Sequence, residues 1–222
     1  MSTDEQQRGF GTRAIKAATR APRVEQRPAA VPIYQSATFH AQDVDDYAEL
    51  VGFERPGYTY SRLENPTAEA MAGAFAELHG AEAGFAFGSG MGAIHATLLS
   101  LVRAGDRIVS TRAVYGSTRA LMERVLRTLG VEIVFVDPVD LEAVERELSA
   151  APTAVLYAET ISNPTIVVAD LARLAELAHA HGAKLVVDNT FASPFLCTPL
   201  ELGADVVVES ATKWLSGHSD VV

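Results

Sequence analysis

From Pro66 onward the chain alternates between helical runs and short apolar runs. Apolar positions at helical spacing predict helices over Thr67–His79, Met91–Val102, Thr118–Leu129, Leu141–Leu148 and Leu171–Ala180. Short apolar, often valine-rich, runs predict strands over Gly84–Phe87, Arg107–Ser110, Glu132–Val136, Thr153–Ala158, Lys184–Val187 and Asp205–Val208. Strands that alternate with helices indicate a mostly parallel sheet with helices on both faces. The pattern therefore predicts an α/β fold, with a large domain over residues 61–222.

The first sixty residues follow a different pattern. Prolines are scattered through them, at Pro22, Pro28, Pro32 and Pro56, and no apolar periodicity persists. Each proline biases the preceding residue away from helix, so the segment Val31–Phe39 is predicted to be extended. Because such a segment buries little apolar surface by itself, we expect residues 1–60 to form an extended N-terminal arm. This arm is either partly disordered or lies on another surface, for example a second subunit.

Composition and charge narrow the class of protein. The chain has 222 residues, of which 48% are hydrophobic, and this suits one globular domain with or without an arm. A formal net charge of -10 argues against a nucleic-acid partner. The single cysteine, Cys197, permits no intrachain disulfide and fits a reducing compartment. No apolar run approaches the roughly 20 residues of a membrane span, and the polar start Met1–Gly9 is unlike a secretory signal. We therefore expect a cytoplasmic protein with no membrane partner.

Lys213 is the first candidate for chemistry. It follows the last predicted strand in the sequence Ser210-Ala-Thr-Lys213, which brings a primary amine and two hydroxyls to one edge of the sheet. The carboxyl ends of parallel strands are where open α/β sheets bind ligands. A lysine there can form a Schiff base with a carbonyl cofactor such as pyridoxal phosphate. The alternative is an ordinary solvated lysine.

A glycine-rich turn, Gly88-Ser-Gly-Met-Gly-Ala93, lies between a predicted strand and a predicted helix. Glycines let the backbone approach a ligand closely, and the free N–H groups at a helix start attract phosphate. The spacing differs from the G-x-G-x-x-G of dinucleotide sites, and no Walker sequence follows. The turn therefore indicates either a phosphate site of another kind or a simple tight turn.

Four more side chains have chemistry that suits a flat, phosphorylated cofactor. Asp188 ends a predicted buried strand and could hold a protonated ring nitrogen. Tyr115 could stack on a ring, and Asn163 could bond a ring hydroxyl. Arg62 could clamp a phosphate. Each also has an ordinary structural explanation, but together with Lys213 they supply the groups that a pyridoxal phosphate site requires.

The chain resembles the Cys/Met-metabolism (transsulfuration) family of pyridoxal phosphate enzymes, which includes cystathionine γ-synthase, cystathionine γ-lyase, methionine γ-lyase and the O-acylhomoserine sulfhydrylases. The resemblance covers nearly the whole chain and depends on the motifs YTYSRLENPT, GSGMGAI, VYGST, ETISNPT, VVDNTFASP and SATKWLSGHSDVV. It implies the fold type I large domain of the aspartate aminotransferase class. It also implies a smaller C-terminal domain that this chain does not include.

The resemblance implies a role for each candidate residue. Lys213 is implied to be the Schiff-base lysine, Asp188 the partner of the pyridinium nitrogen, and Tyr115 both the stacking ring and an acid for the leaving group. The remaining cofactor ligands implied are Gly90, Met91, Ser210 and Thr212 at the phosphate, Asn163 near the ring hydroxyl, and Tyr60 and Arg62 from a neighbouring subunit. The resemblance also implies a homotetramer, built as a dimer of dimers, with active sites shared between subunits.

The implied activity is chemistry at Cγ of a sulfur amino acid or a homoserine ester. We favour γ-elimination slightly over γ-replacement. Ser117 stands where methionine γ-lyases typically carry cysteine and many γ-synthases carry glycine, so the subfamily stays open. The arginine that binds the substrate carboxylate is expected beyond Val222. Two other classes remain as alternatives: a nucleotide-binding oxidoreductase, and a non-catalytic fragment or interaction module.

Overall fold

The computed structural model describes residues 9–17, 29–218, 220 and 221. The chain divides into two compact units, Met1–Ala86 and Phe87–Val222. Parts of the predicted arm, including Pro22 and Pro28, lie outside the described residues. The predicted boundary between arm and domain after residue 60 stays a prediction.

The second unit is built on a five-stranded sheet in the order β2-β1-β3-β4-β5. The strands are β1 (Arg107–Thr111), β2 (Glu132–Val136), β3 (Val155–Glu159), β4 (Lys184–Asp188) and β5 (Val206–Val208). Every neighbouring pair is parallel. All five strands therefore end at the same edge of the sheet, which we call the carboxyl edge, and begin at the opposite amino edge.

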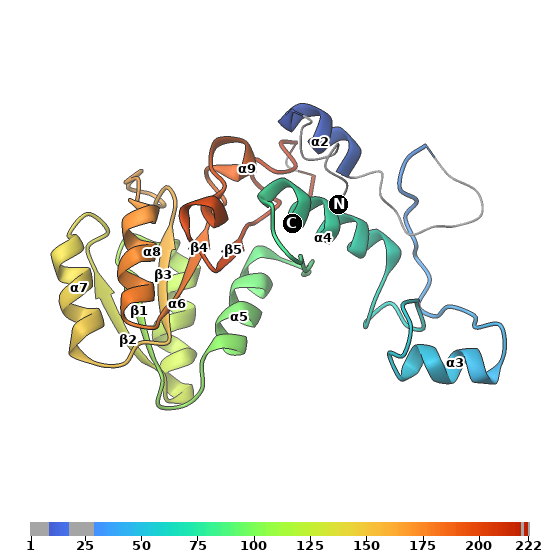
Figure 1. Cartoon of the computed structure of the whole chain (residues 1–222), viewed down its shortest axis with the longest axis horizontal. Helices are drawn as coiled ribbons and strands as arrows, with labels where there is room; N and C mark the ends of the chain where they lie inside the picture. Colours follow the sequence, from blue (N-terminus) through green and yellow to red (C-terminus); the bar gives the residue numbers. More distant parts are fainter. Residues whose placement is uncertain (1–8, 18–28, 219, 222) are drawn as a thin grey trace. The chain divides into compact units, whose positions relative to one another are not determined.

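Helices cover both faces of this sheet, as predicted (Figure 1). Successive residues of a strand point to opposite faces, so Leu156 packs with α7 (Leu141–Ala150) and α8 (Leu171–Ala180). Its neighbour Tyr157 packs with α5 (Gly90–Leu101) and α6 (Gly116–Arg124). Both faces are apolar because both are buried, and this explains the unbroken apolar runs that predicted the strands.

Short helices complete the second unit. A 3-10 helix, η1 (Leu126–Leu129), follows α6, so the single helix predicted over Thr118–Leu129 is divided near Val125. The loop between β4 and β5 contains α9 (Ser193–Leu196) and a second 3-10 helix, η2 (Pro199–Leu202), neither of which was predicted. None of the helices in the described ranges has the length and apolar character that a bilayer crossing requires.

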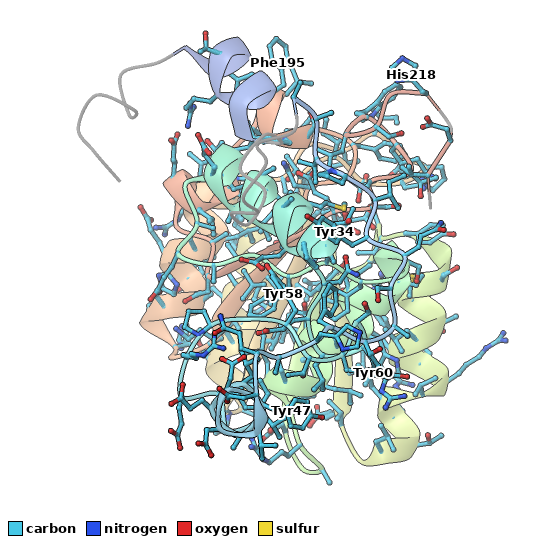
Figure 2. All side chains as sticks on the ribbon, turned by 90° about the vertical axis from the view of Figure 1, so that its right-hand side faces the viewer. Tyr34, Tyr47, Tyr58, Tyr60, Phe195 and His218 are labelled. Atoms are coloured by element: carbon cyan, nitrogen blue, oxygen red, sulfur yellow. The ribbon has the colours of Figure 1, made fainter. Side chains whose placement is uncertain are left out.

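The first unit contains α2 (Phe10–Ala17), α3 (Val44–Val51) and α4 (Pro66–His79). α4 begins as its sequence indicates, since the Asn65 side chain accepts a hydrogen bond from Thr67 N at 2.9 Å and proline occupies the first helical position. The segment before it contacts the same helix start: Tyr34 N donates to Thr67 Oγ1 at 2.9 Å. Tyr34 and Tyr58, both labelled in Figure 2, lie with ring centroids 6.5 and 5.4 Å from that of Phe39.

Two expectations for secondary structure were wrong. Residues 84–87 form no strand, and the Phe85 side chain is 77% exposed. An apolar run becomes a strand only where a neighbouring strand supplies hydrogen bonds, and none of the β-ladders and bridges among the described residues pairs with this run. The helices α2 and α3 also lie within the arm, where no helix was predicted. Both have eight residues, too short for apolar periodicity to be recognised among the prolines.

Two ionic clusters hold the amino edge together. Arg107, only 5% exposed, pairs with Glu132 Oε1 at 3.0 Å and with the Glu147 carboxylate. Asp205 accepts from Lys184 Nζ at 2.7 Å, contacts His179 Nε2 at 2.9 Å and accepts from a main-chain N–H. Burial raises the pKa of Asp205, but the hydrogen bonds from Lys184 and His179 outweigh it, so the pKa lies below its usual value.

Candidate active site

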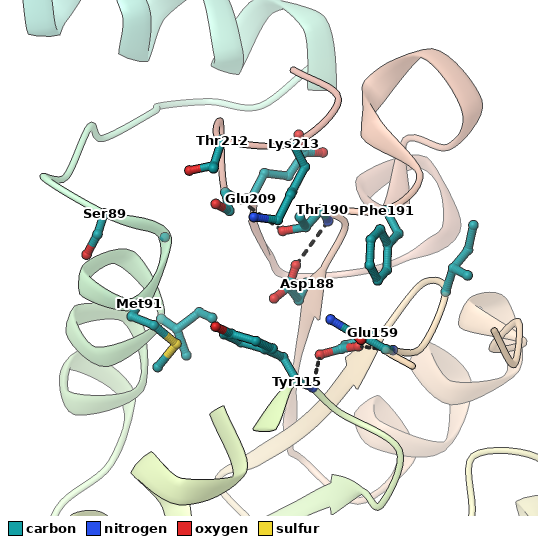
Figure 3. Close-up of a pocket in the computed structure, with 15 residues that line it drawn as sticks. Ser89, Met91, Tyr115, Glu159, Asp188, Thr190, Phe191, Glu209, Thr212 and Lys213 are labelled. Atoms are coloured by element: carbon teal, nitrogen blue, oxygen red, sulfur yellow. Dashed lines mark hydrogen bonds between the residues drawn. The ribbon is translucent and has the colours of Figure 1, made fainter. Parts of the chain in front are cut away.

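The carboxyl edge of the sheet and the N-terminus of α5 enclose a cavity of about 270 Å³ (Figure 3). Eight residues predicted from the sequence line it: Gly90, Met91, Tyr115, Asn163, Asp188, Ser210, Thr212 and Lys213. They come from segments more than a hundred residues apart. The parallel topology brings them together because every strand ends at the same edge.

Tyr60 and Arg62 were also predicted, but they belong to the first unit. There the Arg62 guanidinium carbon lies 4.8 Å from the centroid of the Tyr60 ring. Neither residue is among those that line the cavity. Their expected contribution to a neighbouring subunit stays a prediction.

Asp188 ends β4 at the base of the cavity and is 8% exposed. Its Oδ1 accepts from Thr190 N at 3.0 Å, and its Oδ2 lies 3.5 Å from the donating Tyr157 hydroxyl. Burial raises the pKa of Asp188, and the hydrogen bonds from Thr190 and Tyr157 oppose this effect. The carboxylate therefore gains stability from any cation that enters the cavity.

Glu159 is a cavity residue that the sequence did not single out. It ends β3 in register with Asp188, so two buried carboxyl groups lie on adjacent strands. Glu159 Oε1 accepts from Tyr115 N at 2.6 Å, and Oε2 accepts from Asn163 N at 2.9 Å. Burial raises the pKa of Glu159 to about 7; the Tyr115 hydrogen bond lowers it and the Asp188 charge raises it. An acid directly after a buried strand is the same signal that identified Asp188.

Tyr115 stands at the N-cap of α6 with its ring facing the cavity (Figure 3). The residue is 44% exposed, so packing covers only part of it. Its main-chain N–H is held by Glu159. The ring therefore offers an aromatic face and a hydroxyl to whatever occupies the cavity.

The start of α5 approaches the loop that follows β5. A Cβ atom placed on Gly90 would lie 2.7 Å from Ser210 Cβ, so only glycine fits there without movement. Ser89 caps the helix, and its Oγ accepts from Gly92 N at 3.0 Å. The first N–H groups of a helix have no partner within it and favour an anion at this position. The geometry therefore suits a phosphate.

The loop after β5 carries Ser210, Thr212 and Lys213 into the cavity. Ser210 N donates to Thr190 Oγ1 at 2.9 Å, and Lys213 N donates to Ser210 O at 3.2 Å in a turn. Figure 3 shows the Lys213 side chain directed into the space above Asp188. Thr190, which the sequence reasoning missed, thus joins the loops after β4 and β5.

A buried polar layer supports these loops from below. Asn189 is fully buried and accepts from Thr160 Oγ1 at 2.7 Å. Its amide nitrogen donates to Glu209 Oε1 at 2.8 Å and to Cys197 O at 2.9 Å. Every polar atom of this side chain is used, so the layer fixes three strand ends relative to one another.

Residues 11–222 match the family described as Cys/Met metabolism PLP-dependent enzyme. The chain belongs to this family. Its cofactor is pyridoxal phosphate, and the expected α/β fold with fold type I topology is confirmed by the solved structures it resembles.

Three relatives illustrate the Cys/Met metabolism family. The L-methionine γ-lyase of Pseudomonas putida is 44% identical over 96% of the chain and 53% of its own length. The metB protein of Corynebacterium glutamicum is 39% identical with a TM-score of 0.89, over 99% of this chain and 55% of that one. The metY protein of Campylobacter jejuni contains N′-pyridoxyl-lysine-5′-monophosphate. It is 32% identical with a TM-score of 0.86, over 93% of this chain and 51% of that one. The chain thus spans about half the length of these relatives.

Proposed function

We propose that the protein is a pyridoxal phosphate enzyme of sulfur amino acid metabolism that acts at Cγ of its substrate. One observation carries this proposal: an amine, a buried carboxylate, an aromatic ring and a helix N-terminus surround a single cavity in a member of the Cys/Met metabolism family. Substrates of the methionine, cystathionine or O-acylhomoserine type suit this family. The similarity to a methionine γ-lyase favours γ-elimination.

The cavity residues fit this cofactor. Lys213 supplies the amine that binds the cofactor's carbonyl carbon. Asp188 would pair with the protonated ring nitrogen, and this cation would offset the burial that raises the pKa of the carboxyl group. Tyr115 would stack on the ring, and Asn163 would be available to its hydroxyl group.

The phosphate is assigned to the opposite end of the cavity. The N–H groups of Gly90 and Met91 at the start of α5, together with the hydroxyls of Ser210 and Thr212, supply donors for its oxygens. The close approach of Gly90 to Ser210 supports this assignment, because it brings the two donor segments together and a Cβ at position 90 would push them apart. Tyr60 and Arg62 are assigned to the phosphate of a neighbouring subunit, in a homotetramer located in the cytoplasm.

When bound, pyridoxal phosphate supplies an electron sink for negative charge that develops on the substrate carbons. Lys213 acts as a positioned base that takes the α-proton. Asp188 keeps the ring nitrogen protonated. Tyr115 donates a proton to the substituent that leaves Cγ. Departure of the γ-substituent also requires that a proton be removed from Cβ of the substrate. Addition of water would then release an α-keto acid and ammonia, whereas addition of a thiol at Cγ would give γ-replacement.

Reduction with borohydride tests the assignment of Lys213. The full-length protein is incubated with pyridoxal phosphate, reduced, digested and analysed by mass spectrometry. We expect a phosphopyridoxyl group on Lys213. Modification of another residue, or of none, would contradict the proposal.

Product analysis separates elimination from replacement. The full-length protein is given methionine, cystathionine and an O-acylhomoserine, each with and without an added thiol. Keto acid formed without thiol supports a γ-lyase. A thioether that appears only with thiol supports a cystathionine γ-synthase or a sulfhydrylase instead.

A further inference from the structure

The Glu159 carboxylate connects two separate loops of the cavity. Oε1 accepts from Tyr115 N at 2.6 Å, in the loop after β1, and Oε2 accepts from Asn163 N at 2.9 Å, in the loop after β3. Tyr115 lies 44 residues before Glu159 in the sequence. One buried side chain therefore fixes the main chain at two positions whose own side chains line the cavity.

The hydrogen bonds from the Tyr115 and Asn163 main chains to Glu159 matter because packing covers these two side chains only in part. Tyr115 is 44% exposed. Although it is the N-cap residue of α6, its side chain makes no capping hydrogen bond. A ring held by few neighbours takes its position from the backbone that carries it. Asn163 is only partly buried, so the position of its side chain also depends on its backbone.

The two hydrogen bonds also favour the ionised form of the Glu159 side chain. Both oxygens accept from N–H donors, and a carboxylate satisfies both donors at once. A protonated carboxyl group would direct its O–H toward one of them. Burial and the nearby Asp188 oppose the ionised form and raise the pKa of Glu159 to about 7. A cation in the cavity favours the ionised form that the bridge requires.

We propose that Glu159 is a positioning residue of the cofactor site, which holds the Tyr115 and Asn163 main chains so that both side chains face the bound ring. This inference rests on the proposed function. The role assigned to Glu159 is exerted through the two residues that it anchors, and it requires no contact with the reacting atoms. Its replacement therefore changes how the cofactor is held, beyond any loss of fold stability.

The test compares Glu159→Gln with wild type in the full-length protein. Glutamine keeps the size of the side chain but presents an NH₂ group to one of the two N–H donors, so one bridge is lost. We expect the dissociation constant for pyridoxal phosphate to rise by about 10- to 100-fold, the effect of losing one hydrogen bond to a charged group. The visible circular dichroism of the bound cofactor is expected to weaken, because the ring is held less rigidly.

Glu147→Gln is the matched control. Glu147 is a carboxylate at the amino edge, paired with buried Arg107 and outside the cavity. We expect this variant to lower the thermal midpoint while leaving cofactor affinity and dichroism unchanged. If Glu159→Gln also lowers only the thermal midpoint, its role is purely structural and the inference is overturned.

A double-mutant cycle tests whether Glu159 affects cofactor affinity through Tyr115. Removing the ring with Tyr115→Ala takes away one of the groups that Glu159 positions. The effect of Glu159→Gln on cofactor affinity is then expected to be smaller than in the wild-type background, because coupled residues are not additive. Equal effects in both backgrounds would contradict a role through Tyr115.

Hydrogen exchange of the wild-type protein covers the case in which Glu159→Gln does not fold. The amide protons of Tyr115 and Asn163 are expected to exchange slowly with and without pyridoxal phosphate, and rapid exchange in both states would overturn the bridge. Borohydride labelling keeps the two proposals apart. An unlabelled Lys213 in wild type contradicts the proposed function, whereas a labelled wild type with an unaltered Glu159→Gln contradicts only the role of Glu159.

Discussion

The two edges of the sheet differ in how their charged side chains are neutralised. At the amino edge, Arg107 is paired with two carboxylates, and Asp205 is bonded to Lys184 and His179 so that its pKa is lowered. At the carboxyl edge, Glu159 and Asp188 lie in register on adjacent strands, and burial raises the pKa of both. At the amino edge the acids pair with cations, whereas at the carboxyl edge the hydrogen bonds to both acids come from N–H and O–H donors of the described residues.

The contrast supports the location proposed for the family's cofactor at the carboxyl edge. Charges that are neutralised within the protein stabilise the fold and offer little to a ligand. Buried carboxylates held only by N–H and O–H donors cost free energy until a cation arrives. Binding of a protonated ring offsets this cost. The same sheet therefore has one edge that stabilises it and one edge suited to binding.

Lys213→Ala gives the largest expected effect at the carboxyl edge. Removing the amine eliminates both the covalent attachment and the proposed base, so turnover of the best substrate is expected to fall by about 10³-fold or more. Urea unfolding of the cofactor-free protein should be unchanged, since Lys213 is exposed. A large loss of stability instead would assign this lysine to the fold.

Arg107→Met gives the largest expected effect at the amino edge. It removes the buried guanidinium together with its hydrogen bonds to Glu132, Glu147 and Thr153. The carboxylates left behind are partly exposed, so the expected cost is that of the lost charge-assisted hydrogen bonds, about 3 kcal/mol of unfolding free energy. Urea denaturation measures this loss. Borohydride labelling of Lys213 under native conditions should persist, and its disappearance would show that the two edges are not independent.

The pH dependence of stability tests the carboxyl edge without any ligand. The pKa of Glu159 rises from about 4.5 to about 7 on folding, so its contribution is fully present below pH 4.5 and is lost as pH rises through 7. At about 1.4 kcal/mol for each pH unit, the cofactor-free protein is expected to lose roughly 3 kcal/mol over this interval. Glu159→Gln should abolish this part of the profile; an unaltered profile would contradict the assignment.

Asp205→Asn is expected to give the smallest change in stability. The pH dependence of this contribution is opposite in sign to that of Glu159. Because the pKa of Asp205 is lowered in the folded protein, its contribution is present above the unfolded pKa and is lost as pH falls below it. The variant is expected to lose about 1 kcal/mol at neutral pH, as for a partly exposed ion pair. Thermal unfolding at pH 3 and pH 7 measures it, and the difference from wild type should shrink at pH 3.

Much of the carboxyl edge could be predicted because its chemistry follows strand ends. Asp188 comes directly after a buried run, and Lys213 follows the next strand, so parallel topology alone places them together. Glu159 and Thr190 were missed because their roles depend on register and on which loops meet across 44 and 20 residues. The order β2-β1-β3-β4-β5 likewise depends on packing between faces rather than on any local pattern.

The close contact between Gly90 and Ser210 has a consequence for how the protein folds. It joins the first helix of the second unit to the loop after its last strand, across 120 residues. Contacts between such distant residues are slow to form because a long loop must be closed first. During synthesis, the site is therefore incomplete until β5 has left the ribosome and paired with β4. Capture of the cofactor is expected to be among the last events in the maturation of this unit.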